Sequence, residues 1–305
     1  MDSYRKFTGR TQVLPFYHTV YEKKKPHFAH LNFSRSIKRF REDLDYLTTH
    51  FENVPIERAG EHSNSFHLTF DDGMSEIYEV IAPLLLEKRL DATFFITTDF
   101  LDNKNLFFSH KVSLIANEVN QSPESRGKVA GFLKCPENQI QKKLYSHPSS
   151  INEIADLIHV NFDDYLQQQK PYCTTAQISE LQKMGFTIGN HSKTHRNFNT
   201  LHFSEQKEEI LHVNQILKEF DLDVYYFCFP YGDDQIKNEL FHWMYDEGKI
   251  RKSFGISGMK ADGFPNHLHR ILMEHENLSA KEIISAEYLL YAMKSVMKPN
   301  VVKRC

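Results

Sequence analysis

Short apolar runs alternate along this chain with longer stretches of helical periodicity, and this alternation limits the folds that it can adopt. Strands are expected at the runs rich in aromatic and β-branched residues: 13–18, 66–70, 92–97, 186–189, 224–229 and 253–256. Apolar residues recur at helical spacing at 77–85, and further helices are expected at 175–184, 204–220 and 235–247. Strands that alternate with helices predict a largely parallel sheet, which is either open or closed into a barrel.

Two of the expected helices carry a capping box in their first turn. Thr174 is followed three residues later by Gln177, and Ser279 is followed in the same way by Glu282. Each pair can satisfy amide groups that a helix leaves without intrahelical partners. We therefore expect helices to begin immediately after Thr174 and Ser279.

Residues 100–174 interrupt this alternation, because they contain helical patterns but no convincing strand. The helical patterns lie at 107–119, 137–145 and 151–169. A structureless connection of this length would be unusual within a compact domain. We therefore expect residues 1–305 to form a single domain that carries an α-helical insertion at 100–174.

The composition is that of an ordinary globular protein, with 40 % hydrophobic residues, 25 % charged residues and a net charge of −3. This charge gives no reason to expect nucleic acid as a partner. No apolar stretch approaches the roughly 18 residues of a membrane-spanning helix, so we expect no transmembrane segment. The sequence leaves the oligomeric state open.

The N-terminus and the cysteines indicate where the protein works. Residues 1–6 are polar and lack the apolar core of a secretion signal. The cysteines Cys135, Cys173, Cys228 and Cys305 are scattered and form no Cys-x-x-Cys pair. They are typical of reduced thiols rather than of a disulfide framework. We therefore expect a cytoplasmic protein.

Chemically distinctive residues follow two of the expected strands. Asp71 and Asp72 come directly after one apolar run, and His191 and His195 follow another. Ligands and catalytic groups collect at the ends of strands in α/β sheets. One aspartate and two imidazoles form a ligand set that suits a zinc-like divalent ion with an open position for water. The other aspartate could act as a base beside that water, so the pattern predicts a metal-dependent hydrolase.

The segments 69–73 (Thr-Phe-Asp-Asp-Gly) and 191–195 (His-Ser-Lys-Thr-His) resemble the first two motifs of the NodB-type polysaccharide deacetylases, carbohydrate esterase family four. Residues 229–232 (Phe-Pro-Tyr-Gly) look like the third motif, and the resemblance extends over residues 11–275 apart from the helical insertion. It implies a distorted (β/α) barrel with seven or eight mostly parallel strands. It also implies hydrolysis of an N-acetyl group from an amino sugar.

The resemblance further implies a role for each matching residue. Asp71 would be the general base, and the metal ligands would be Asp72, His191 and His195. The expected metal is zinc, although two nitrogens and one oxygen also accept cobalt, nickel or manganese. The backbone amide of Tyr231 would help to stabilise the oxyanion.

Two histidines compete for the role of general acid. Much of the family takes the acid from a late Leu-x-His motif, which His269 offers here. In the branch that contains the poly-N-acetylglucosamine deacetylases, the acid instead follows a tyrosine on the first strand, as His18 follows Tyr17. The residues after His269, beginning with Arg270, resemble a segment of that branch, so we favour His18.

The third motif departs from the family pattern at its start. The family commonly has an arginine there, which orients the catalytic aspartate, whereas this chain has Cys228. We expect Arg270 to replace that arginine and to hold Asp71, the alternative being that Arg270 forms a surface ion pair. Cys228 is expected to be a small buried residue rather than a nucleophile. Pro230 and Tyr231 of the same motif would contact the substrate.

These observations favour a metal-dependent deacetylase whose partner is an N-acetylated glycan or oligosaccharide, working in surface-polysaccharide biosynthesis. Two alternatives stay open. The same metal site could hydrolyse a non-sugar amide, or the protein could be a catalytically inactive glycan-binding homologue. The missing arginine of the third motif favours inactivity, whereas the intact aspartate pair and histidine pair favour an enzyme.

Overall fold

The computed structural model describes residues 11–31, 33–297 and 300–304 of the chain. Residues 1–6 and Cys305, which contributed to the expectation of a cytoplasmic protein, lie outside the described residues. Within the described ranges, no helix has both the length and the apolar character needed to cross a membrane.

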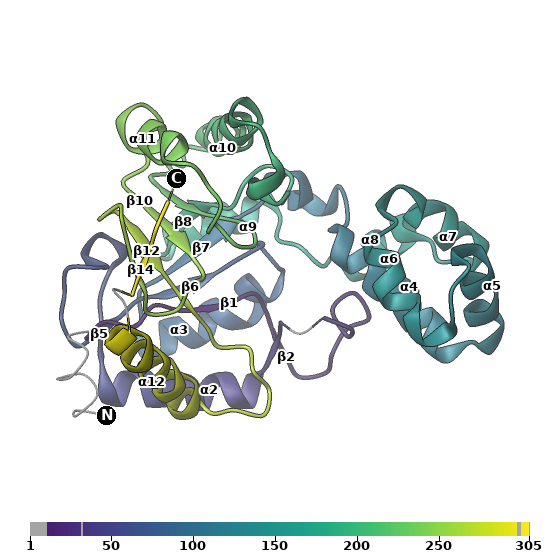
Figure 1. The fold of residues 1–305 in the computed structure, drawn as a ribbon, viewed down its shortest axis with the longest axis horizontal. Helices are drawn as coiled ribbons and strands as arrows, with labels where there is room; N and C mark the ends of the chain where they lie inside the picture. The colour runs from purple at the N-terminus through teal and green to yellow at the C-terminus, as the bar shows by residue number, and fades with distance from the viewer. Residues whose placement is uncertain (1–10, 32, 298–299, 305) are drawn as a thin grey trace.

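Eight strands form the main sheet (Figure 1). Their order is β12-β10-β9-β8-β7-β6-β1-β13. They are β1 (Pro15–Tyr17), β6 (Leu68–Phe70), β7 (Ala92–Ile96), β8 (Thr187–Asn190), β9 (Tyr226–Cys228), β10 (Lys252–Gly255), β12 (His267–His269) and β13 (Ile271–Leu272). All of their pairings are parallel. From β6 to β10, strands that follow one another along the chain are also neighbours in the sheet, as expected when connections cross over between parallel strands.

A single extended segment joins the two edges of this sheet. β12 pairs with β10 at one edge, and β13, which begins just after Arg270, pairs with β1 at the other. The backbone amide of Arg270 donates to the carbonyl of Gly255 (3.0 Å), and the amide of Ile271 donates to the carbonyl of Leu14 (2.8 Å). Residues 267–272 therefore close the sheet into a distorted (β/α) barrel, and the fold expected from the sequence is confirmed.

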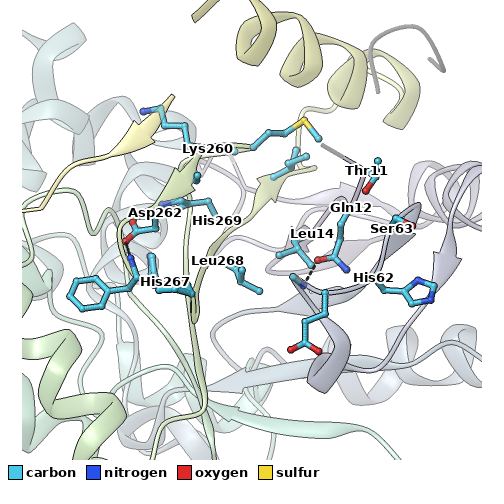
Figure 2. A pocket seen from close by; sticks show the side chains of 18 residues that line it. Thr11, Gln12, Leu14, His62, Ser63, Lys260, Asp262, His267, Leu268 and His269 are labelled. Atoms are coloured by element: carbon cyan, nitrogen blue, oxygen red, sulfur yellow. Dashed lines mark hydrogen bonds and ion pairs between the residues drawn. The ribbon is translucent and has the colours of Figure 1, made fainter. Parts of the chain in front are cut away.

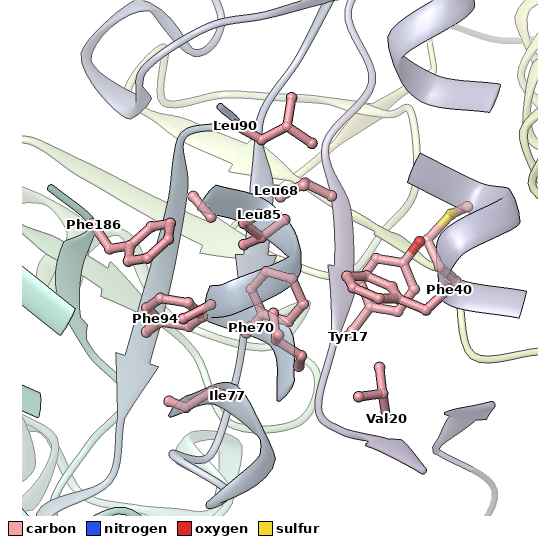
Figure 3. Packing of buried hydrophobic residues seen from close by; sticks show 14 of the residues in the cluster. Tyr17, Val20, Phe40, Leu68, Phe70, Ile77, Leu85, Leu90, Phe94 and Phe186 are labelled. Carbon is pink, nitrogen blue, oxygen red and sulfur yellow. The ribbon is translucent and has the colours of Figure 1, made fainter. Parts of the chain in front are cut away.

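Helices cover the outside of the barrel. They are α2 (Ile37–His50), α3 (Ala82–Lys88), α9 (Thr175–Lys183), α10 (Phe203–Lys218), α11 (Asn238–Asp246) and α12 (Ala280–Met297). A π-helical turn, η2 (Ile77–Ile81), leads directly into α3. Figure 3 shows part of the core between strands and helices, where Tyr17, Phe70 and Phe94 of three neighbouring strands pack with Phe40 of α2. Because side chains alternate along a strand, Leu14, Phe95, Cys228 and Phe254 form a separate buried cluster inside the barrel.

Both expected capping boxes are present. Thr174 Oγ1 accepts from the amide of Gln177 (3.2 Å), and Gln177 Oε1 accepts from the amide of Thr174 (2.8 Å). Ser279 and Glu282 form the same reciprocal pair before α12, at 3.3 and 2.8 Å.

The chain between β7 and α9 forms a helical body that projects beside the barrel (Figure 1). Its α-helices are α4 (Phe108–Gln121), α5 (Pro123–Leu133), α6 (Ile140–Tyr145), α7 (Ile151–Leu157) and α8 (Phe162–Gln169). They enclose an apolar cluster of their own, which includes Ile115, Leu144 and Ile154. The helical pattern expected at 151–169 is present as two helices, because His159 takes a left-handed φ of 58° that separates α7 from α8.

Shorter elements complete the described chain. Three small parallel pairs join β2 (Val20–Tyr21) to β3 (Arg35–Ser36), β4 (Glu52–Asn53) to β5 (Ser65–Phe66), and β11 (Ala261–Asp262) to β14 (Val301–Val302). Short 3-10 turns are η1 (Ile56–Arg58), η3 (Thr98–Asn103), η4 (Glu137–Gln139), η5 (Pro148–Ser150) and η6 (Phe198–Thr200).

Candidate active site

Three side chains meet at the carboxyl ends of β6 and β8, at one mouth of the barrel. Asp72 follows β6, and His191 and His195 follow β8. The Asp72 Oδ1 atom lies 3.4 Å from His191 Nε2 and 3.1 Å from His195 Nε2. Asp72 and His191 are buried, whereas the His195 side chain is partly exposed. The structure thus brings together the three residues that the sequence proposes as metal ligands, here called the ligand group.

Tight turns position the residues of this mouth. The φ angles of Asp72, Ser192, His195 and Tyr231 are 75°, 72°, 57° and 59°. Left-handed conformations are uncommon for residues other than glycine, and they cluster at functional sites. The Ser192 hydroxyl accepts from the amide of His195 (3.0 Å) and so fixes the turn that follows His191. These turns let residues close in sequence direct their side chains to a common centre.

The donor atoms of the ligand group fit a divalent metal ion. His191 Nδ1 donates to the backbone carbonyl of Cys228 (3.0 Å), so the Nε2 lone pair is left facing Asp72. Asp72 Oδ1 is buried and has no hydrogen-bond partner among the described residues. A buried carboxylate oxygen that lies against two imidazole nitrogens without a hydrogen bond is destabilising unless a cation or a proton lies between them. One oxygen and two nitrogens are also a ligand set that zinc accepts with a position left open.

Asp71 lies beside the ligand group and is held by Arg270. The guanidinium nitrogens Nη1 and Nη2 donate to Asp71 Oδ1 and Oδ2, each at 2.7 Å. Nη1 also donates to Thr69 Oγ1 (2.9 Å), and the guanidinium carbon lies 4.3 Å from the centre of the Phe16 ring. Arg270 is fully buried inside the barrel, so the alternative of a surface ion pair is wrong.

Both aspartates are ionised at neutral pH. Burial alone would raise the pKa of Asp71, but the charge of Arg270 outweighs burial and holds that pKa below its usual value. Burial likewise acts to raise the pKa of Asp72, but His195 and His191 hold it well below its usual value. One carboxylate is therefore available for a metal ion and the other for a proton.

Cys228 fills the space beside the Asp71–Arg270 pair. Its Sγ atom lies 2.6 Å from Arg270 Nη2 and 3.8 Å from Asp71 Oδ2. Burial raises the pKa of the Cys228 thiol well above its ordinary value, so the thiol stays protonated. A protonated, completely buried thiol is a poor nucleophile, in keeping with the expectation of a small buried residue.

His18 follows β1 at the same mouth and is paired with Glu274. His18 Nδ1 lies 2.6 Å from Glu274 Oε2, and Glu274 Oε1 accepts from the amides of His18 and Thr19 at 2.8 and 3.1 Å. Burial acts to lower the pKa of His18, but the Glu274 carboxylate, with smaller contributions from Asp72 and Asp71, raises it to about 9. The imidazole is therefore protonated at neutral pH, which is the state that a general acid requires.

His269, the other candidate acid, points away from Asp71. It belongs to a buried cluster with Asp233, Asp262 and His267, and its Nε2 lies 3.1 Å from Asp262 Oδ2. Figure 2 shows His267, His269 and Asp262 beside a pocket where residues 267–272 close the barrel. No member of the ligand group lines that pocket. The structure places His18, and not His269, near the ligand group.

The third motif lies after β9 at this mouth. Pro230 is buried, whereas Tyr231 is half exposed. The centres of the Tyr231 and His195 rings are 5.0 Å apart. Tyr231 therefore lies on the open side of the ligand group.

Two supporting residues were not expected from the sequence. Glu274 pairs with His18 across 256 residues of chain and belongs to no recognisable motif. Glu209 of α10 accepts from the amide of Thr194 (2.8 Å) and from Arg196 Nη2 (3.2 Å), so it fixes the loop that carries the second histidine. The sequence could have indicated Glu209 only through its position, which falls on the buried face of α10.

The family model described as polysaccharide deacetylase matches residues 59–243. The structure of the Streptococcus pyogenes deacetylase PplD in complex with acetate is 13 % identical, covers 90 % of this chain and 97 % of its own, and has a TM-score of 0.59. The structure of IcaB from Ammonifex degensii is 16 % identical, covers 92 % of this chain and 98 % of its own, and has a TM-score of 0.58. The structure of a polysaccharide deacetylase from Bacillus cereus is 13 % identical, covers 91 % of this chain and 69 % of its own, and has a TM-score of 0.56.

No curated protein sequence matches the chain. At these identities the solved structures show likeness of fold alone. The family model, in contrast, spans more than half of the chain, including the aspartate motif, the histidine motif and the third motif. The chain therefore belongs to the polysaccharide deacetylase family of hydrolases.

Proposed function

We propose that this protein removes N-acetyl groups from an amino-sugar glycan and that it requires a divalent metal ion, for which zinc is our candidate. The observation that carries the proposal is the Asp71–Arg270 pair held directly beside the ligand group. A glycan-binding protein would need neither a set of metal ligands nor an ionised base next to it. Membership of the polysaccharide deacetylase family supports this kind of substrate.

The side chains can divide the hydrolysis between them. A divalent ion bound by Asp72, His191 and His195 would polarise the amide carbonyl and acidify a water molecule. Asp71 is ionised and oriented by Arg270, so it can accept a proton as the water oxygen bonds to the carbonyl carbon. The negative charge that develops on the carbonyl oxygen needs a donor, and the backbone amide of Tyr231 is our candidate.

The leaving amine needs a proton as the C–N bond breaks. His18 carries that proton at neutral pH, because Glu274 raises its pKa to about 9. Transfer of the proton to the nitrogen releases acetate and leaves a free amino sugar. The position of His18 also supports a likeness to the poly-N-acetylglucosamine deacetylase branch, and hence a role in surface-polysaccharide biosynthesis.

Acetate release from N-acetylglucosamine oligomers, measured on zinc-loaded protein, tests the proposal. We expect one acetate for each amine formed. Asp71→Asn should bind zinc with unchanged stoichiometry and release no acetate, because it lacks the base but keeps the ligand group. The double variant Asp72→Asn/His195→Gln should lose both zinc and activity.

The same assay separates the alternatives. Acetate release from a non-sugar acetamide, with none from the oligomers, would assign the metal site to another amide. Zinc binding and oligomer binding without release from any substrate would identify an inactive glycan-binding homologue.

We also propose that the protein works in the cytoplasm. Cys135, Cys173 and Cys228 are free thiols, and Cys173 and Cys228 are buried. Free thiols are typical of proteins in reducing compartments. Recovery of the native protein outside the cytoplasmic membrane after cell fractionation would contradict this proposal.

A further inference from the structure

Few aromatic rings of this protein face solvent. Among the phenylalanine, tyrosine and tryptophan side chains of the described residues, only Tyr145, Phe220 and Tyr231 are exposed, at 44 %, 42 % and 50 %. Phe220 lies just beyond the end of α10. The two tyrosines come from distant parts of the chain, and their surroundings show that they share one site.

Tyr231 places its ring against a member of the ligand group. The Tyr231 and His195 ring centres are 5.0 Å apart and their planes are inclined by 54°. The ring of Phe107, at the entrance to the helical insertion, also contacts His195, at 4.9 Å. His195 is therefore in contact with a buried ring from the insertion and an exposed ring from the third motif.

Tyr145 belongs to the helical insertion but reaches the same mouth. It is the last residue of α6, and its ring packs against Phe108 at 6.0 Å. Phe108 directly follows Phe107, so adjacent residues contact Tyr145 and His195. Ring contacts thus run from Tyr145 to Phe108, and from the adjacent Phe107 through His195 to Tyr231. Tyr145 and Tyr231 are therefore the exposed members of one set of aromatic contacts that includes His195 of the ligand group.

The ring of Tyr145 lies outside the apolar cluster of the insertion. Ile140 and Leu144 of the same helix are buried in the apolar cluster of the insertion, whereas Tyr145 is exposed. Apolar surface left in water is unfavourable, and two such rings at one site indicate a surface for a ligand.

A sugar chain has the chemistry that such rings recognise. Each sugar ring presents C–H groups on its faces and hydroxyl groups around its edge. A tyrosine can cover the apolar face while its own hydroxyl stays hydrated. It also loses little conformational entropy, because only two side-chain torsions become fixed.

We propose that Tyr145 and Tyr231 form a glycan-binding subsite that carries the sugar chain from the barrel mouth onto the helical insertion. This inference rests on the proposed function, since it describes how the polymeric substrate of that same site is held. The sugar unit that loses its acetyl group lies at the ligand group, and an adjoining unit stacks on Tyr145. The insertion thereby makes the enzyme selective for oligosaccharides over single sugars.

The test compares a long and a short substrate in the same variants. The ratio of kcat/KM for an N-acetylglucosamine pentamer to kcat/KM for a phenyl acetate ester reports the contribution of distant sugar units. In Tyr145→Ala we expect this ratio to fall about tenfold, the effect of losing one stacked ring. Tyr145→Trp keeps a flat ring and should keep the ratio. Phe220→Ala removes an equally exposed ring elsewhere and is the matched control.

Binding measured without turnover separates this inference from the proposed function. Calorimetric titration of Asp71→Asn with the pentamer should give a Kd that Tyr145→Ala weakens about tenfold. If Tyr145→Ala changes neither the ratio nor the Kd while the wild type deacetylates the pentamer, the subsite is overturned and the function stands. If the wild type binds the pentamer through Tyr145 without releasing acetate, the subsite stands and the function fails. If the wild type neither binds nor hydrolyses the pentamer, both fail.

Discussion

The arginine that contacts Asp71 comes from an unusual place in the chain. Cys228 occupies the position where the family commonly has an arginine, and Arg270 reaches the carboxylate instead. Residues 267–272, here called the closing segment, pair first with β10 and then with β1, and Arg270 lies between the two pairings. Hydrogen bonds to both edges of the sheet therefore hold the backbone of Arg270 and Ile271. A side chain supported in this way can hold a catalytic group in one orientation.

Arg270→Lys keeps the charge but cannot make the contact with two parallel hydrogen bonds. We expect kcat/KM to fall about a hundredfold, because Asp71 loses its fixed orientation. The pKa of Asp71 should rise, because the lysine charge would offset the effect of burial less completely than Arg270 does. The acid limb of the pH profile should therefore move to higher pH. The measurement is kcat/KM as a function of pH in both proteins. An acid limb that stays in place would show that Arg270 does not control Asp71.

The pair of His18 and Glu274 leads to a second prediction from pH dependence. Glu274 raises the pKa of His18, so the protonated imidazole is lost only as the pH rises through about 9. Glu274→Gln removes the main raising interaction, while burial, which lowers the pKa, remains. We therefore expect the alkaline limb of kcat/KM to move to lower pH by at least about one unit. His269→Gln is the control for the other candidate acid and should leave that limb unchanged.

Single residues of the site were predictable from the sequence to different degrees. Asp71 and His191 could be named because each follows an apolar run within a distinctive motif. Arg270 could be proposed because the third motif has Cys228 in place of the usual arginine, and a guanidinium can hold a carboxylate through two hydrogen bonds. Glu274 could not be found in this way, because its role depends on the closure of the barrel, which brings it to His18.

Among the secondary-structure elements, those with one apolar face or an apolar run were predictable. β12 and β13 were missed because His267, His269 and Arg270 make the closing segment polar, and these residues face other charged groups rather than an apolar core. α2 was missed although its buried residues follow helical spacing. α5 carries few apolar residues, and its boundary with α4 depends on Ser122 as an N-cap.

β8 illustrates how one strand controls the site. Gly189 lies just before His191, and a Cβ atom added there would lie 2.4 Å from Phe95 Cδ1 inside the barrel. Gly189→Ala should therefore destabilise the protein by about 1–3 kcal/mol and lower kcat, because β8 must shift and move His191 with it. Gly131→Ala is the matched control, since nothing lies within 4 Å of its added Cβ in α5. That change should stabilise the protein by about 0.5–1 kcal/mol. Denaturant unfolding compares the two, and equal effects would contradict the prediction.

At the scale of the whole molecule, the ligand group connects segments that are remote in the chain. Asp72 follows β6, whereas His191 follows β8, and the helical insertion lies between them. An ion bound by both would stabilise the folded barrel relative to the unfolded chain, in which these residues are far apart.

Metal binding should therefore raise the melting temperature of the protein. At a zinc concentration about a hundred times Kd, the stabilisation is about 2.7 kcal/mol, and we expect Tm to rise by roughly 5 °C relative to chelator-treated protein. Asp71→Asn should keep this shift, because Asp71 lies outside the ligand group, whereas Asp72→Asn/His195→Gln should lose it. Scanning calorimetry with and without zinc measures both. A shift that survives the loss of Asp72 and His195 would place the ion elsewhere, for which the buried cluster around His269 is the alternative.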